Sequence, residues 1–116
     1  MGMSDAAIKI ALIEPEPLHT AWIDELIRLG GVPAARTSPA KADIILLGLE
    51  TFGESEMDFI ESLHGLFADT PIVILSGTDA RLWTGEAVRL GARHVLAKDD
   101  LTSDNLASAI RFYHCP

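Results

Sequence analysis

The chain has 116 residues, of which 48% are apolar, so it supports one compact domain with a hydrophobic core and excludes bulk disorder. The formal net charge of −8 disfavours direct binding of nucleic acid, whose phosphates would be repelled, and favours cationic partners or a basic protein face. The single cysteine, Cys115, excludes a disulfide framework and a zinc-cysteine cluster.

The N-terminal segment is not expected to be a targeting signal, because no basic stretch leads into an apolar one. No apolar run is long enough to span a bilayer, so no membrane association is expected. We expect a single cytoplasmic domain over residues 1–116. Residues 1–7 are expected to be disordered or derived from cloning, with Met1-Gly2-Met3 as the cloning remnant.

The first two predicted elements are a strand and an amphipathic helix. Ile8–Ile13 is predicted as a strand that stops at Glu14-Pro15. Pro17–Leu29 is predicted as a helix, because proline suits a first helical turn and Gly30-Gly31 ends the segment. The expected buried stripe of this helix consists of Leu18, Trp22, Leu26 and Leu29.

The next segments are short. Residues 32–36 favour a second strand, and the stretch 37–41 has no room for a full helix. Residues 43–49 predict a third strand that is apolar on both faces. A helix is then predicted over residues 54–67, with a buried stripe of Met57, Ile60, Leu63 and Phe67.

The last third of the chain is equally regular. Residues 71–76 predict the fourth strand. A helix follows that is capped by Thr78 or Asp79 and runs to about Leu90, before a fifth strand over His94–Ala97. Thr102 or Ser103 is expected to cap the last helix, whose inward side chains are Leu106, Ile110 and Tyr113.

Strands that alternate with helices and read as continuous apolar runs are typical of a parallel sheet covered on both faces. The sequence therefore predicts an α/β fold, a doubly wound five-stranded parallel sheet of flavodoxin-like type. Such folds place ligands at the carboxyl ends of the strands. Those ends are Glu14, Gly48, Ser76 and Lys98.

These strand ends resemble those of response regulator receiver domains in two-component signalling. The likeness rests on four segments in order, residues 13–18, 45–50, 71–77 and 91–98. In this family the third strand usually ends in a phosphoaccepting aspartate, the fourth in a hydroxyl residue and the fifth in a lysine. The resemblance implies a (βα)5 receiver fold, here with a shortened or missing second helix.

The sequence departs from the family pattern at several positions. Gly48 stands where the phosphoacceptor is expected, and Pro15 replaces one half of the acidic pair. Val95 replaces the usual aromatic switch residue. Asp99 follows Lys98 where the family commonly has proline, so the loop after the fifth strand is expected to differ.

Magnesium binding is expected to be weak or lost, because this ion demands near-ideal octahedral oxygen coordination and Glu14 is the one candidate ligand. We therefore expect no cofactor. Lys98 is expected to pair with Glu14, and Ser76 to be a small residue at a strand end. Glu50 lies close enough in sequence to reach the rim of the pocket, whereas no histidine shows metal-ligand spacing.

A candidate partner face includes Arg81, Trp83 and Arg89, with Arg93 close by. For Trp83, core packing and an exposed anchor are both compatible with the sequence. In the resembled family, partners bind around the fourth helix, the fifth strand and the fifth helix.

The leading hypothesis is a pseudo-receiver, a non-enzymatic module that acts through phosphorylation-independent protein interaction. Its partner would be a histidine kinase, another receiver, an output domain or a second copy in a homodimer. One alternative is a regulatory domain that binds a small anion or metabolite at Ser76 and Lys98. Another is a receiver phosphorylated at a different residue, such as Glu14 or Ser76.

Overall fold

The structure is a computed structural model that describes residues 7–77 and 80–115. The expectation of a disordered N-terminus therefore falls almost entirely outside the described residues, as does the predicted helix cap at Thr78 or Asp79.

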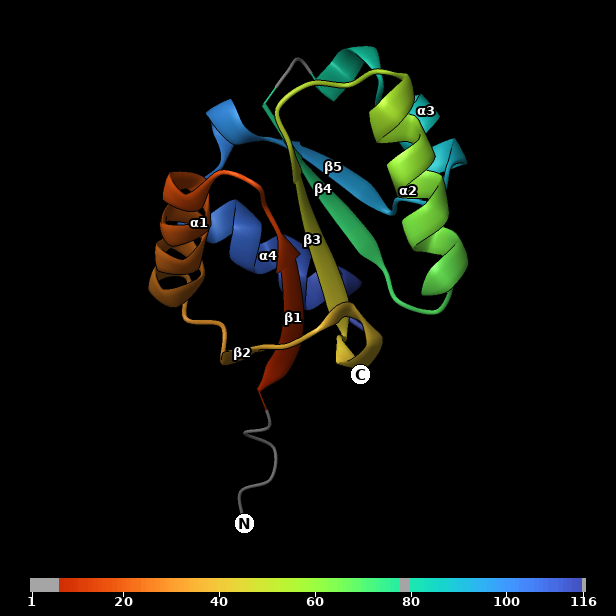
Figure 1. Cartoon of the computed structure of the whole chain (residues 1–116). Coiled ribbons are helices and arrows are strands. Elements are labelled where there is room, and N and C mark those ends of the chain that lie inside the picture. Colours follow the sequence, from red (N-terminus) through yellow and green to blue (C-terminus); the bar gives the residue numbers. More distant parts are fainter. Residues whose placement is uncertain (1–6, 78–79, 116) are drawn as a thin grey trace.

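The core of the fold is a parallel sheet of five strands in the order β2-β1-β3-β4-β5 (Figure 1). This order confirms the predicted flavodoxin-like topology. β3 and β4 are buried over nearly their whole length, as their continuous apolar sequences predict. The strands are β1 (Ile8–Ile13), β2 (Ala34–Arg36), β3 (Ile44–Leu49), β4 (Ile72–Ser76) and β5 (His94–Ala97).

Helices cover both faces of the sheet (Figure 1). One apolar cluster joins the sheet to α1 (Pro17–Leu29) and α4 (Ser103–Tyr113). A second cluster joins the opposite face to α2 (Glu54–Leu66) and α3 (Thr84–Arg89). The chain is therefore a three-layer α/β structure with one core on each side of the sheet.

The buried stripe of α1 differs from the predicted one. Ile23 and Ile27 are its buried residues, whereas Leu18 and Leu29 are exposed. The sequence offers two adjacent apolar rows, and the row that contains the two isoleucines faces the sheet. The helix ends as predicted, since Gly30 is the C-cap and Gly31 adopts a φ of 75°.

The predicted continuous helix up to Leu90 is also wrong in part. A 3-10 turn, η3 (Ala80–Leu82), precedes the short helix α3, and Trp83 interrupts them with a non-helical φ of −137°. This break lets the Trp83 side chain turn inward, where it stacks on Phe52 with ring centroids 3.9 Å apart. The burial of the Trp83 indole thus stabilises the fold more than an uninterrupted helix would.

The other helix termini follow the sequence. Thr102 caps α4 by accepting a hydrogen bond from the backbone of Asn105, whose side chain accepts one from the backbone of Thr102. Leu106 and Ile110 are buried in the core, and Tyr113 is half-buried against His94.

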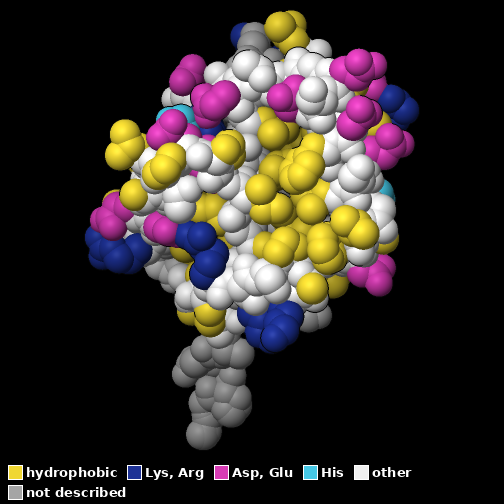
Figure 2. Space-filling model, in the orientation of Figure 1, with side chains coloured by type: hydrophobic (Ala, Val, Ile, Leu, Met, Phe, Trp, Pro, Cys, Tyr) yellow, Lys and Arg dark blue, Asp and Glu magenta, His cyan; other side chains and the backbone are white. Residues whose placement is uncertain are grey.

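The connection between β2 and β3 contains only a 3-10 turn, η2 (Pro39–Lys41), as the short stretch 37–41 predicts. Each of the other connections between strands that follow one another in sequence contains an α-helix. Figure 2 shows apolar side chains gathered over β3 and beside α2.

Candidate functional site

The carboxyl ends of the parallel strands bring distant residues to one edge of the sheet. Glu14 follows β1, Gly48 and Glu50 lie at the end of β3, and Lys98 follows β5. β3 and β4 are paired so that Leu49 is level with Ser76. The four predicted strand-end residues therefore gather at the expected edge.

Lys98 is the centre of this site, and its side chain is only 5% exposed. Its ammonium donates hydrogen bonds to Glu14 Oε1 at 2.8 Å and to Glu50 Oε2. The Nδ1 atom of His19 lies 2.9 Å from the same ammonium. The expected Lys98–Glu14 pair is present. The side chains of Glu50 and His19 also contact the Lys98 ammonium, from the solvent side.

The side chain of Glu14 is fully buried, with an exposure of 0%. Its second carboxylate oxygen accepts a hydrogen bond from the backbone N–H of Glu16 at 3.0 Å. A buried charge is tolerated only when it is paired and hydrogen-bonded. Both oxygens of Glu14 meet this condition, and no buried side-chain nitrogen or oxygen among the described residues lacks a partner.

The Glu14 carboxylate occupies the space beside Gly48. A Cβ added at Gly48 would lie 1.7 Å from Glu14 Oε1, far inside van der Waals contact. The longer stem of glutamate brings its carboxylate from the end of β1 to the side of β3. The space that a side chain at position 48 would need is therefore filled by a carboxylate from the neighbouring strand.

Glu50 and His19 close the outer side of the site. The hydrogen bond from Lys98 lowers the pKa of Glu50, and the charges of Lys98 and His19 act in the same direction, whereas partial burial opposes them. The Nδ1 atom of His19 is 3.1 Å from Glu50 Oε2. It can accept from Lys98 when unprotonated, or donate to Glu50 when protonated.

The sequence anticipated only part of this arrangement. Glu50 reaches the rim, as its place after Gly48 allowed, but the role of His19 was missed because only metal-ligand spacing was considered. Its position in the first turn of α1 was the available signal, since a helix that follows β1 begins at the same edge of the sheet as the strand ends.

A metal ion does not fit this site as it is arranged. Glu14, His19 and Glu50 each offer a ligand atom, and these atoms lie within 4.8 Å of one another. The Lys98 ammonium contacts all three groups, however, and so occupies the place of a cation. A divalent ion would have to displace a buried positive charge.

Ser76 and Val95 are buried beside the site, at 1% and 8% exposure. Val95 belongs to the apolar cluster under α2 and α3. The loop after β5 is a 3-10 turn, η4 (Lys98–Asp100), that positions Lys98 inward.

The predicted partner face requires one correction. Trp83 is only 7% exposed and belongs to the core, so it is not an exposed anchor. Its stacking on Phe52 explains the burial. Arg81 and Arg89 are exposed, but Arg89 forms an ion pair with Glu86, which reduces the positive charge of this surface.

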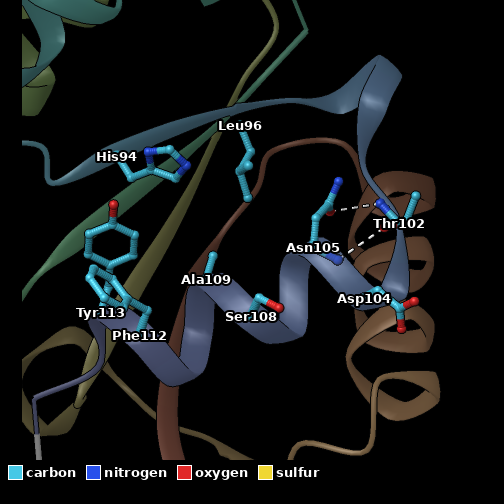
Figure 3. Close-up of a pocket in the computed structure, with 9 residues that line it drawn as sticks. All are labelled: His94, Leu96, Thr102, Asp104, Asn105, Ser108, Ala109, Phe112 and Tyr113. Carbon is cyan, nitrogen blue, oxygen red and sulfur yellow. Dashed lines mark hydrogen bonds between the residues drawn. The ribbon is translucent and has the colours of Figure 1, made fainter.

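A groove lies between β5 and α4 (Figure 3). It has a volume of about 640 Å³, and Phe112 at its rim is 78% exposed. β5 is the last strand of the sheet, so this groove runs alongside an edge strand. Leu96 and Ala109 contribute apolar surface, and Asp104 and Asn105 contribute polar groups.

Comparison with models of known protein families finds no match. Among curated proteins, 81 residues of the chain are 36% identical to the acid tolerance regulatory protein ActR of Rhizobium meliloti. The aligned part is 70% of this chain and 41% of that protein, so the chain spans about two-fifths of the length of the relative it matches.

Solved structures share the fold. A Burkholderia pseudomallei protein assigned to pilus assembly matches with a TM-score of 0.79 and 19% identity, covering 100% of this chain and 96% of that one. The pilus assembly protein CpaE of Burkholderia thailandensis matches with a TM-score of 0.76 and 22% identity, covering 91% and 97%. A response regulator from Thermotoga maritima matches at 0.72 and 15%, covering 93% and 98%. The chain thus has the fold of response regulator receiver domains.

None of the helices in the described part of the structure is long and apolar enough to cross a membrane.

Proposed function

We propose that this chain is a pseudo-receiver that acts through protein–protein interaction without phosphorylation. The observation that carries the proposal is the contact between Glu14 and Gly48. The space for a phosphoacceptor side chain is filled by a carboxylate that is itself neutralised by the buried Lys98. The Lys98 ammonium is bound by the carboxylates of the pocket itself, Glu14 and Glu50.

The chemistry of phosphoryl transfer supports this proposal. Transfer to a receiver needs an accessible carboxylate and a cation that neutralises the incoming charge. Gly48 offers no nucleophile, and Glu14 is buried in an ion pair. Ser76 is buried as well, so a non-standard acceptor at either position is disfavoured.

A small-anion site is disfavoured by the charges. Lys98 is the cation that an anion would need, but its ammonium already binds Glu14 and Glu50. Two carboxylates on one ammonium leave a net negative charge, which repels a second anion. The cavity beside Lys98 is also bordered by Asp99.

The β5–α4 groove is the surface on which we propose that a protein partner binds. Its apolar floor and the exposed Phe112 offer the kind of aromatic anchor that is common in interfaces. The partner classes are a histidine kinase, another receiver or an output domain in a longer protein. Because the chain is similar in fold to pilus assembly proteins, components of such an assembly are candidates for the partner.

Intact-mass spectrometry after incubation with acetyl phosphate and magnesium tests the first half of the proposal. We expect no phosphoryl adduct, while an active receiver treated in parallel gains one. An adduct on this chain would contradict the proposal.

Affinity capture with the wild type and a Phe112→Glu variant tests the second half. The variant is expected to lose the partner while it keeps its melting temperature, because Phe112 is largely exposed. Capture of the same partner by both proteins would place the interface elsewhere.

A further inference from the structure

The Lys98 ammonium has one acceptor for each of its three protons. An ammonium group donates hydrogen bonds and accepts none. Its partners are Oε1 of Glu14 at 2.8 Å, Oε2 of Glu50, and Nδ1 of His19 at 2.9 Å. Because Lys98 can only donate, Nδ1 of His19 must offer its lone pair. The hydrogen-bond network therefore assigns His19 as a neutral ring with its proton on Nε2.

Protonation of His19 is incompatible with this arrangement. A proton on Nδ1 would turn that atom into a donor and place two positive groups 2.9 Å apart. The nearer of the two carboxylates is Glu50, whose Oε2 lies 3.1 Å from Nδ1. Oε2 of Glu14 lies farther away, at 4.0 Å, and already accepts a hydrogen bond from the backbone of Glu16. Glu50 is therefore the acceptor that a protonated His19 would use.

The four side chains differ in how freely they can respond. Those of Glu14 and Lys98 are 0% and 5% exposed, so the surrounding core holds them in place. Those of His19 and Glu50 are 36% and 50% exposed and lie on the solvent side. Exposed side chains change rotamer readily. A proton on His19 would therefore move the imidazole and Glu50, and leave the Glu14–Lys98 pair where it is.

The charges around the imidazole are mostly negative. Glu14, Glu50 and Lys98 together carry a net charge of −1, from two carboxylates and one ammonium. Asp99 of η4 borders the same cavity and adds a further negative charge. A hydrogen bond from Lys98 lowers the pKa of Glu50, and a charge on His19 lowers it further. Glu50 is thus ionised in the range of about pH 5–8 in which imidazole groups change charge, so the acceptor is available as soon as an imidazolium forms.

A change at His19 would extend to Trp22, which lies in the same helix. The two rings meet edge to face, with centroids 5.9 Å apart and an interplanar angle of 68°. His19, Trp22 and Glu50 all border a cavity of about 470 Å³ beside Lys98. Rotation of the imidazole toward Glu50 would therefore alter both the ring contact and the outline of this cavity.

We infer that the Lys98 site is a proton-operated switch. Uptake of one proton from solvent at Nδ1 of His19 replaces the hydrogen bond from Lys98 to His19 by one from His19 to Glu50. In the neutral state Lys98 holds both of these side chains. In the protonated state Glu50 pairs with the imidazolium, and the surface at the start of α1 changes.

This inference goes beyond the proposed function, and the two can fail separately. A phosphoryl adduct after treatment with acetyl phosphate would refute the proposed function, whereas the response of His19 to protons is measured without any phosphoryl donor. An unresponsive His19 would leave the proposals for Gly48 and for the β5–α4 groove intact.

Long-range proton–nitrogen NMR correlation of the imidazole rings tests the neutral state, because it shows which ring nitrogen carries the proton. The chain has four histidines, so the His19 signals are identified by their absence from the spectrum of His19→Gln. This variant is expected to fold, because the His19 side chain is partly exposed. At neutral pH we expect the proton of His19 on Nε2. A proton on Nδ1 at neutral pH would overturn the inference.

An NMR titration from neutral to acidic pH tests the switch itself. The signals of the Glu50 carboxylate and of the Trp22 indole N–H should shift with the same midpoint as the His19 ring. His19→Gln should abolish both shifts, whereas His64→Gln, a matched control on α2, should keep them. Signals of Glu50 and Trp22 that stay constant while His19 titrates would refute the switch, and so would shifts that persist in His19→Gln.

Discussion

The carboxylate of Glu14 lies in the space that a side chain at Gly48 would occupy. A Cβ at position 48 would lie 1.7 Å from Glu14 Oε1, so a side chain there would force the Glu14 carboxylate away from its present place. The glycine is thus a packing requirement of the buried Glu14–Lys98 pair. This relationship ties the absence of a side chain at position 48 to the position of the Glu14 carboxylate in its ion pair.

Gly48→Ala should therefore destabilise the fold. The added methyl group displaces a buried carboxylate from its partners, and overpacking of this kind costs about 1–3 kcal/mol. Urea unfolding measures the change. Gly65→Ala is the control, because open space surrounds that helical glycine and alanine there should stabilise by about 0.5–1 kcal/mol. Equal effects at both glycines would contradict the steric account.

Removal of one partner of the buried Glu14–Lys98 pair is expected to lower the free energy of unfolding. Lys98→Met leaves Glu14 charged and unpaired in the core, which costs about 3–5 kcal/mol in the free energy of unfolding. The double variant Glu14→Gln/Lys98→Met should recover part of that loss, since no bare charge remains. Arg28→Met breaks an exposed pair with Glu25 and should cost less than about 1 kcal/mol.

Protonation of Glu50 at acidic pH should lower the stability of the folded chain. Its pKa is lower in the folded chain than the ordinary value of 4.5, mainly because Lys98 donates a hydrogen bond to it. The unfolded chain therefore takes up the proton first, so this contribution is fully present above pH 4.5 and is lost as the pH falls through the lower, folded pKa.

Denaturant unfolding at a series of pH values from neutral to acidic checks this. Glu50→Gln should flatten the decline in stability below pH 4.5, by a modest amount because half of the side chain is exposed to solvent. Parallel pH profiles for the two proteins would show that Glu50 contributes nothing.

The inward position of Trp83 is testable by fluorescence. Phe52→Ala removes the ring stacked on the indole, so the emission should shift to the red. Because Phe52 is only partly buried, the fold should lose less than the roughly 3–5 kcal/mol typical of a fully buried phenylalanine. The measurement is made in a Trp22→Phe background, because Trp22 is the other tryptophan. An unchanged emission maximum would contradict the stacked geometry.

The class of fold and the order of its elements can be predicted from local patterns in the sequence. Apolar runs over β3 and β4, the glycines after α1 and the cap at Thr102 act locally, so their effects can be predicted from neighbouring residues. The short stretch 37–41 likewise excluded a full helix before β3. Gly48 and Lys98 were placed at the strand ends for the same reason.

The way in which side chains from distant segments meet depends on the packing of the whole fold. Lys98 lies 84 positions from Glu14 and 79 from His19, so no local pattern reveals that their groups share one site. The choice between two apolar rows on α1 and the inward turn of Trp83 also depended on packing against the sheet. Local propensity specifies an element, but the contacts of its side chains are decided by the surfaces that cover it.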